Sequence, residues 1–167
     1  MVIGMDINPR NSYKFHENNP GAIFINADAL LRRGFLPFAD KQFNKINIVL
    51  PLGGLLHALT RPNEYPLWPD MKRILMDKGT IEIVVDSPYA GQGYDFDGQE
   101  YSVQDPEEII YATAKSHGFQ VFFDRLSAKD LAAYGTDYSK FTSSWLQSDP
   151  FLRVYKITAE LNPEPVV

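Results

Sequence analysis

The sequence predicts an α/β fold in which a mostly parallel β-sheet is covered by helices on both faces. Short apolar runs typical of strands alternate with helical patterns along most of the chain. Such alternation favours parallel strands joined by right-handed crossovers. A length of 167 residues, with 44% hydrophobic and 22% charged residues, suits one globular domain with a buried core. We expect this domain to span residues 1–161 and the proline-containing residues 162–167 to form a loose tail.

Strands are predicted where β-branched and apolar residues run together between turn signals. Lys45–Leu50 is almost continuously apolar, which indicates burial on both faces. Phe151–Leu161 alternates between apolar and polar residues, which indicates an edge or antiparallel strand. The predicted strands, in order, are Val2–Asp6, Ala22–Asn26, Lys45–Leu50, Thr80–Val85, Phe119–Phe123 and Phe151–Leu161.

Helices are predicted from apolar periodicity and from start and stop signals. The helix that follows Asp105 begins with an acidic cap and Pro106, and ends near Gly118. Ser127 and Asp130 resemble a capping box at the start of another helix. We expect a loop over Ser87–Gln99, and the remaining helices or helical turns over Asn11–Asn18, Leu30–Gly34, Leu55–Leu59 and Asp70–Lys78, the last stopped by Gly79.

Composition narrows the classes of function. The chain has no cysteine, which excludes disulfides, thiolate metal sites and a cysteine nucleophile. It contains neither an apolar run near the roughly 20 residues of a membrane-spanning helix nor a signal-peptide pattern, so we expect a cytoplasmic protein without a membrane partner. The three histidines have no partners at metal-ligand spacing, and we predict no metal site. A net charge of −5 counts against broad electrostatic attraction to nucleic acids.

The carboxyl ends of three predicted strands carry distinctive residues. Ligands of open parallel sheets bind at these ends. Asp6 could accept hydrogen bonds from both hydroxyls of a ribose, and Asp28 beside Ala27 could hold an adenine amino group and leave room for its ring. The turn that starts at Pro51 is rigid and could line a reacting group. Each feature alone also fits a simple turn or helix cap, and it is their order, one in each successive βα turn, that favours a ligand site.

A family resemblance rests on these same segments. VIGMDINP, FINADALL, NKINIVLPLGGLLHAL and ILMDKGTIEIVV resemble the second to fifth motifs of the class I S-adenosylmethionine-dependent methyltransferases. Within that class, INIVLPLGGLLHAL and LSAKDLAAYGTDYSKFTSSWLQ are similar to segments of the aminoglycoside-resistance methyltransferases that act on a ribosomal RNA adenine. The second segment is a loop between the last strands in that subfamily and holds the flipped base through a Ser/Thr-Ser/Thr-Trp sequence, here Ser143, Ser144 and Trp145.

The resemblance implies a Rossmann-like class I methyltransferase sheet with a C-terminal antiparallel strand, and S-adenosylmethionine as the cofactor. The residues that it assigns to cofactor binding are Asp6, Ile7, Asn8, Ala27, Asp28, Ala29, Pro51 and Leu52. Those that it assigns to substrate binding are Gly53, Leu55, His57, Ser143 and Trp145. The implied substrate is RNA, a nucleobase or another small molecule.

Several features differ from the family pattern. Leu52 stands where the subfamily has a tryptophan that stacks on the base, and the basic residues that follow the tryptophan in the subfamily are absent after Trp145. Both differences count against ribosomal RNA as the substrate. The first strand and the glycine-rich cofactor loop of the family are missing from this sequence. We therefore expect one of three arrangements: the two strands beside the missing one pair directly, a second chain or a second copy in a homo-oligomer completes the sheet, or the sequence is part of a longer methyltransferase.

Two classes of function remain open. In the first, the chain is a methyltransferase or the C-terminal part of one. In the second, it is a catalytically inactive binding module or a half-domain that a partner completes. Smaller alternatives also stay open: His57 as a partly buried helix histidine, Trp145 as a core residue, and the cluster Tyr89, Tyr94, Phe96 and Tyr101 as a lid or a protein-contact surface. Trp68 is interpreted as a packing residue.

Overall fold

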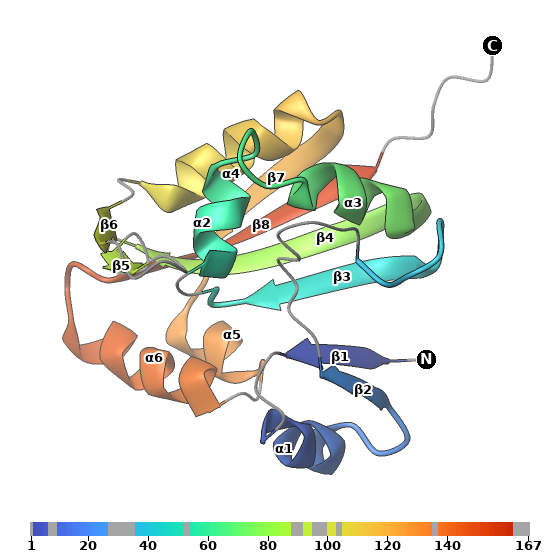
Figure 1. Ribbon diagram of the computed structural model, residues 1–167. Helices are drawn as coiled ribbons and strands as arrows, with labels where there is room; N and C mark the ends of the chain where they lie inside the picture. Colours follow the sequence, from blue (N-terminus) through green and yellow to red (C-terminus); the bar gives the residue numbers. More distant parts are fainter. Residues whose placement is uncertain are drawn as a thin grey trace. The chain divides into compact units, whose positions relative to one another are not determined.

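The chain forms two compact units, Met1–Leu36 and Pro37–Val167 (Figure 1). The structure is a computed structural model that describes residues 2–6, 10–26, 36–51, 54–87, 92–94, 100–102, 105–134 and 137–161.

The first unit is a β-α-β crossover. Strand β1 (Ile3–Asp6) pairs in parallel with β2 (Ile23–Asn26), and α1 (Asn11–Asn18) connects them. Phe15 of α1 packs on Phe24 of β2, with ring centroids 5.7 Å apart. It also covers Gly4 so closely that a Cβ there would lie 2.5 Å from its Cε2 atom. The predicted strands and helix at this end of the chain are confirmed.

The second unit contains a four-stranded sheet in the order β3-β4-β8-β7. Its strands are β3 (Phe43–Val49), β4 (Leu75–Ser87), β7 (Phe119–Arg125) and β8 (Arg153–Leu161). Its helices are α2 (Gly54–Thr60), α3 (Leu67–Ile74), α4 (Pro106–Ser116), α5 (Ala128–Ala132) and α6 (Asp137–Ser148). A short hairpin of β5 (Gln92–Tyr94) and β6 (Glu100–Ser102) falls partly within the predicted loop, where no strand was expected.

Strand β8 runs against the direction of the other three strands. It is antiparallel to both β4 and β7, whereas β3 and β4 are parallel. The predicted mostly parallel sheet with a C-terminal antiparallel strand is therefore confirmed. Of the two alternatives for this strand, edge or antiparallel, the structure confirms the antiparallel one: β8 lies between β4 and β7, and its Val154, Ile157 and Ala159 are fully buried.

Helices cover both faces of this sheet (Figure 1). On one face, Leu131 of α5 packs with Val84 and Val154 in an apolar cluster. On the other face, the Tyr111 ring of α4 lies edge-on to Phe123 of β7, with centroids 6.1 Å apart. Phe123 is paired with Ile157 of β8, so these two side chains are on the same face of the sheet. Ile157 and Val154 are three residues apart on β8, and side chains alternate along a strand, so the α4 and α5 contacts lie on opposite faces. Figure 1 shows α2, α3 and α4 on the second face and α5 and α6 on the first.

Strand β3 is less buried than its sequence predicted. Asn44, Lys45 and Asn47 are exposed, and Lys45 forms an ion pair of 2.9 Å with Glu82 of β4. The prediction of burial on both faces was wrong. Within the four-stranded sheet β3 is a terminal strand, and a terminal strand does not need to be apolar on both faces.

The predicted helix Asp70–Lys78 is shorter than expected. Helix α3 ends at Ile74, and residues 75–87 form β4, so Gly79 is not a helix stop. Gly79 is instead a position of close contact, where a Cβ would lie 2.8 Å from the carbonyl oxygen of Met76. The left-handed residue next to it is Lys78, with φ of 64°.

Helices with strong terminal signals were predicted well. Helix α4 ends at Ser116 as expected, with Pro106 in its first turn and Gly118 at φ of 85° after its end. Asp105 occupies the N-cap position, but its side chain makes no capping hydrogen bond. The capping box of α5 is confirmed, because the Ser127 hydroxyl accepts from the Asp130 amide and the Asp130 carboxylate accepts from the Ser127 amide. The predicted turn at 30–34 and the tail 162–167 lie outside the described residues.

Candidate functional site at the carboxyl ends of the strands

The first unit brings the ends of β1 and β2 together. Asp6 pairs in register with Asn26 at the last position of this parallel pair. Asp28 follows Asn26 by two residues in the sequence. The side chain of Asp6 is not among those described, and the other predicted cofactor residues of this unit, Ile7, Asn8, Ala27, Asp28 and Ala29, lie outside the described residues. Their roles stay predictions.

In the second unit the predicted residues after β3 lie around the start of α2. Pro51 is buried directly after the strand, and Leu50 before it has a left-handed φ of 51°. Leu55 is half-buried on α2, whereas His57 is only 3% exposed and its ring centroid lies 5.7 Å from that of Tyr65. This burial favours the packing role that we considered for His57. Leu52 and Gly53 lie outside the described residues.

The family resemblance implied that Ser143 and Trp145 lie in a loop. They lie instead on helix α6. The Ser143 hydroxyl is buried and donates a 2.7 Å hydrogen bond to the carbonyl oxygen of Ala128 in α5. The side chain of Trp145 is 43% exposed, so it is not a core residue. Trp68, by contrast, is fully buried and donates from Nε1 to the Leu59 carbonyl oxygen at 3.0 Å, which confirms its packing role.

The end of β4 carries buried polar groups that sequence reasoning missed. Asp86 and Glu107 are 1% and 7% exposed, and burial raises the pKa of both carboxyl groups above their ordinary values. Ser87 forms a side-chain hydrogen bond with Glu107, which partly opposes this shift in the pKa of Glu107. Oδ1 of Asp86 and Oε2 of Glu107 have no hydrogen-bond partner among the described residues. The strand-end argument applied to Asp6 would also have selected Asp86.

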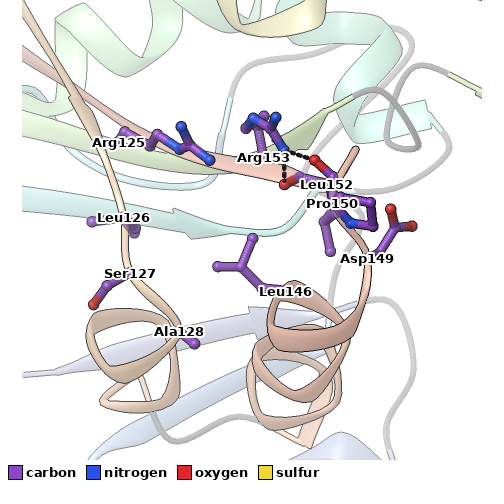
Figure 2. A pocket seen from close by; sticks show the side chains of 9 residues that line it. All are labelled: Arg125, Leu126, Ser127, Ala128, Leu146, Asp149, Pro150, Leu152 and Arg153. Atoms are coloured by element: carbon purple, nitrogen blue, oxygen red, sulfur yellow. Dashed lines mark hydrogen bonds between the residues drawn. The ribbon is translucent and has the colours of Figure 1, made fainter.

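A cavity of about 460 Å³ lies where β7 ends and β8 begins (Figure 2). We call it the arginine cavity, because two of its lining side chains are guanidinium groups. It is lined by Arg125, Leu126, Ser127, Ala128, Leu146, Asp149, Pro150, Leu152 and Arg153. Arg125 is exposed, whereas Arg153 is half-buried and donates from Nη1 to the carbonyl oxygens of Pro150 and Leu152. The sequence analysis selected neither arginine.

These features of the second unit lie at the same end of its sheet, where the parallel strands finish. Strands β3, β4 and β7 run in the same direction, so Pro51, Asp86 and Arg125 all lie at or just beyond carboxyl ends. Open α/β sheets bind their ligands at this end, beyond the carboxyl ends of the strands. The arrangement places the buried Pro51, two buried carboxyl groups and a cationic cavity at that end of the strands.

Comparison with solved structures identifies the fold. The 16S rRNA methyltransferase KamB matches 98% of this chain over 77% of its own length, with a TM-score of 0.69 and 13% sequence identity. The 1,6-didemethyltoxoflavin-N1-methyltransferase of Burkholderia thailandensis, whose structure contains S-adenosylhomocysteine, matches 97% of this chain over 61% of its length, with a TM-score of 0.55 and 13% identity. The chain has the class I methyltransferase fold.

The same fold also occurs in a protein named for another reaction. The [4+2]-cyclase SpnF matches 97% of this chain over 67% of its own length, with a TM-score of 0.57 and 14% identity. The sequence matches no protein-family model and no curated protein. At these identities the likeness establishes the architecture alone.

No helix within the described ranges combines the length and the apolar character needed to cross a membrane.

Proposed function

We propose that this chain binds S-adenosylmethionine and, as a methyltransferase or part of one, transfers its methyl group to a nitrogen of a nucleobase, free or in RNA. The observation that supports the proposal is the match of a class I methyltransferase fold to nearly the whole chain, with β8 inserted antiparallel between β4 and β7. KamB is named for methylation of 16S rRNA, and the Burkholderia enzyme for methylation at a ring nitrogen, N1.

The chain's own residues would divide the work of binding. Asp6 would accept hydrogen bonds from the ribose hydroxyls, and Asp28 from the adenine amino group, with Ile7, Asn8, Ala27 and Ala29 beside them. The segment from Pro51 to Gly53 would line the transfer site, with Leu55, His57 and Trp145 as further substrate contacts. When bound, the cofactor supplies the electrophilic methyl group, and alignment with the accepting nitrogen supplies most of the catalysis.

Titration calorimetry with S-adenosylhomocysteine tests the binding step. We expect micromolar binding by the purified chain and at least tenfold weaker binding by Asp6→Ala, because a hydrogen bond to a charged group contributes about 1.5–3 kcal/mol. Asp6→Asn, which keeps one acceptor oxygen, should be intermediate. Asp77→Ala is the matched control, because Asp77 is exposed and pairs only with Lys41 among the described ion pairs.

A second function is favoured by the terminal position of β3 in the four-stranded sheet. A terminal strand offers unpaired backbone groups to another strand. In this alternative the chain is a methyltransferase-like binding module or a half-domain that a second chain, or a second copy, completes. A folded chain that gives no heat with S-adenosylhomocysteine would contradict binding by this chain alone and leave this alternative.

A further inference from the structure

The arginine cavity carries two guanidinium groups that neighbour each other through the sheet. Arg125 is paired with Tyr155 across β7 and β8, and Arg153 is two residues before Tyr155 on the same face. Diagonal neighbours of this kind lie about 7–8 Å apart between their Cα atoms, within reach of long side chains. Figure 2 shows both side chains at one side of the cavity.

Hydrogen bonds hold Arg153 in place and leave part of its guanidinium group available. Both of its described hydrogen bonds, to Pro150 and Leu152, come from Nη1. Among the described residues, its Nε and Nη2 atoms donate to no acceptor, and Arg125 forms neither an ion pair nor a hydrogen bond through its side chain. The cavity therefore contains a fixed guanidinium group and a free one, and both can bind a planar or tetrahedral anion.

The other polar groups of the cavity are already engaged. The Ser127 hydroxyl donates to Asp130 at 2.6 Å, and Oδ1 of Asp149 accepts from the Phe151 amide at 2.8 Å. With Asp149 as the one anionic lining residue, the lining has a formal charge of +1, although the whole chain has −5. A positively charged cavity in an otherwise acidic protein favours the binding of anions in that cavity.

Apolar side chains form the remaining walls. Leu126, Leu146 and Pro150 line the cavity and are at least partly exposed, whereas Leu152, which also lines it, is fully buried. A volume of about 460 Å³ falls within the range of roughly 300–1,000 Å³ that is typical of small-molecule sites. The site thus pairs a cationic end with apolar walls.

We propose that the arginine cavity binds a small organic anion whose carboxylate or phosphate lies between Arg125 and Arg153 and whose apolar body packs against Leu126 and Leu146. The site does not rest on the proposed methyl transfer, because anion binding requires neither the cofactor nor a reaction.

Nuclear magnetic resonance titration of the full chain with phenylacetate, and separately with phenyl phosphate, tests this site. We expect saturable shifts of the Arg125 and Arg153 Nε–H signals and of the Leu126 and Leu146 methyl signals with at least one of the two anions. Phenylacetamide, which has the same apolar body without the charge, should bind at least tenfold more weakly than the better of the two anions. The stronger of the two anions identifies the preferred head group.

Two substitutions and a control complete the test. Arg125→Gln removes an exposed side chain and should fold normally, and Arg153→Gln removes the anchored one; each should weaken anion binding about tenfold. Arg61→Gln removes the same charge from an exposed pair with Glu64 and should leave binding unchanged. Equal binding of phenylacetamide, undiminished binding by Arg125→Gln, or shifts caused by a short single-stranded RNA but by neither small anion would each overturn the proposal.

Discussion

Ser143 and Trp145 lie two residues apart on α6 but have different surroundings. The Ser143 hydroxyl is buried and bonded to Ala128, so it joins α6 to α5. Trp145 is 43% exposed. Of the two residues that the family resemblance assigned to the substrate, the structure thus favours Trp145 for contact and Ser143 for support.

Replacing Ser143 with alanine should lower the free energy of unfolding by about 1 kcal/mol, because the buried hydrogen bond to Ala128 is lost. Urea denaturation measures the change. Ser144→Ala, one residue further along and exposed, should stay within about 0.5 kcal/mol of the parent chain. Equal stability of the Ser143 variant and the parent chain would contradict a supporting role.

Asp86 should make the stability of the chain dependent on pH. Burial raises its folded-state pKa above the ordinary 3.8, so the folded state binds its proton more tightly than the unfolded state. The free energy of unfolding should then fall as pH rises from 3.8 through the raised pKa. Asp86→Asn should therefore be more stable than the parent chain at pH 7, and the difference should disappear below pH 3.8.

Denaturation curves across this pH range measure the effect of Asp86→Asn. Asp77→Asn serves as the matched control, because Asp77 is exposed and its ion pair with Lys41 is of the surface kind that contributes about 0–1 kcal/mol. A difference between Asp86→Asn and the parent chain that stays constant from acid to neutral pH would contradict the assignment.

At the scale of elements, the junction of α3 and β4 depends on a contact that sequence patterns do not reveal. The spacing of Met71 and Ile74 correctly predicts a helix, and both side chains are buried. The end of that helix is set by the pairing of the following residues with β3, which begins at Phe43 and Leu75. Gly79 then lies against the Met76 carbonyl group, a role that differs from the helix stop expected from sequence.

Gly79→Ala should destabilise the chain by about 1–3 kcal/mol, because the added methyl group would overlap the Met76 backbone at 2.8 Å. Thermal denaturation measures the loss. Lys78→Gly is the matched control at the neighbouring position: its left-handed φ favours glycine, so we expect a roughly neutral change. A harmless Gly79→Ala would show that the junction can shift.

Helix α6 explains one limit of prediction from sequence. Among the side chains of α6 that the structure describes, the buried ones are Ser139, Thr142 and Ser143, which have helical spacing but are polar. Methods that search for apolar periodicity therefore miss it. Helices α4 and α5 were predicted closely, because their ends are set by local signals such as Pro106 and the capping pair Ser127 and Asp130.

The candidate site was likewise predictable only where local sequence signals mark its residues. Strand-end reasoning located Pro51 and could have located Asp86, because each follows a recognisable strand in the sequence. Arg125 and Arg153 were not predictable, because they become neighbours only through the register of β7 and β8. Local sequence contains no information about that pairing.

At the scale of the whole molecule, the two units differ in how deeply their strands are buried. Ile83 and Ile157 are paired across β4 and β8 and are fully buried. In the first unit, β1 and β2 form a two-stranded sheet, and none of the residues from 2 to 26 whose burial the structure describes is fully buried. Two-stranded sheets are marginally stable by themselves.

Native-state hydrogen exchange should reflect this difference. We expect the amides of β4 and β8 to exchange slowest, at the rate of global unfolding, and those of β1 and β2 to exchange through smaller openings at much faster rates. Mass spectrometry of peptides covering residues 2–26 and 75–87 measures both. Equal protection of the two segments would contradict unequal stability.

The central place of β8 has a consequence for biosynthesis. A ribosome delivers the N-terminal residues first, yet β4 and β7 are bridged only by residues 153–161. Until those residues leave the exit tunnel, the nascent chain carries two strands with unpaired edges, which other chains or chaperones can contact. Of the four strands of this sheet, the one translated last is therefore the one that closes it, and the sheet is completed only after residues 153–161 have been synthesised.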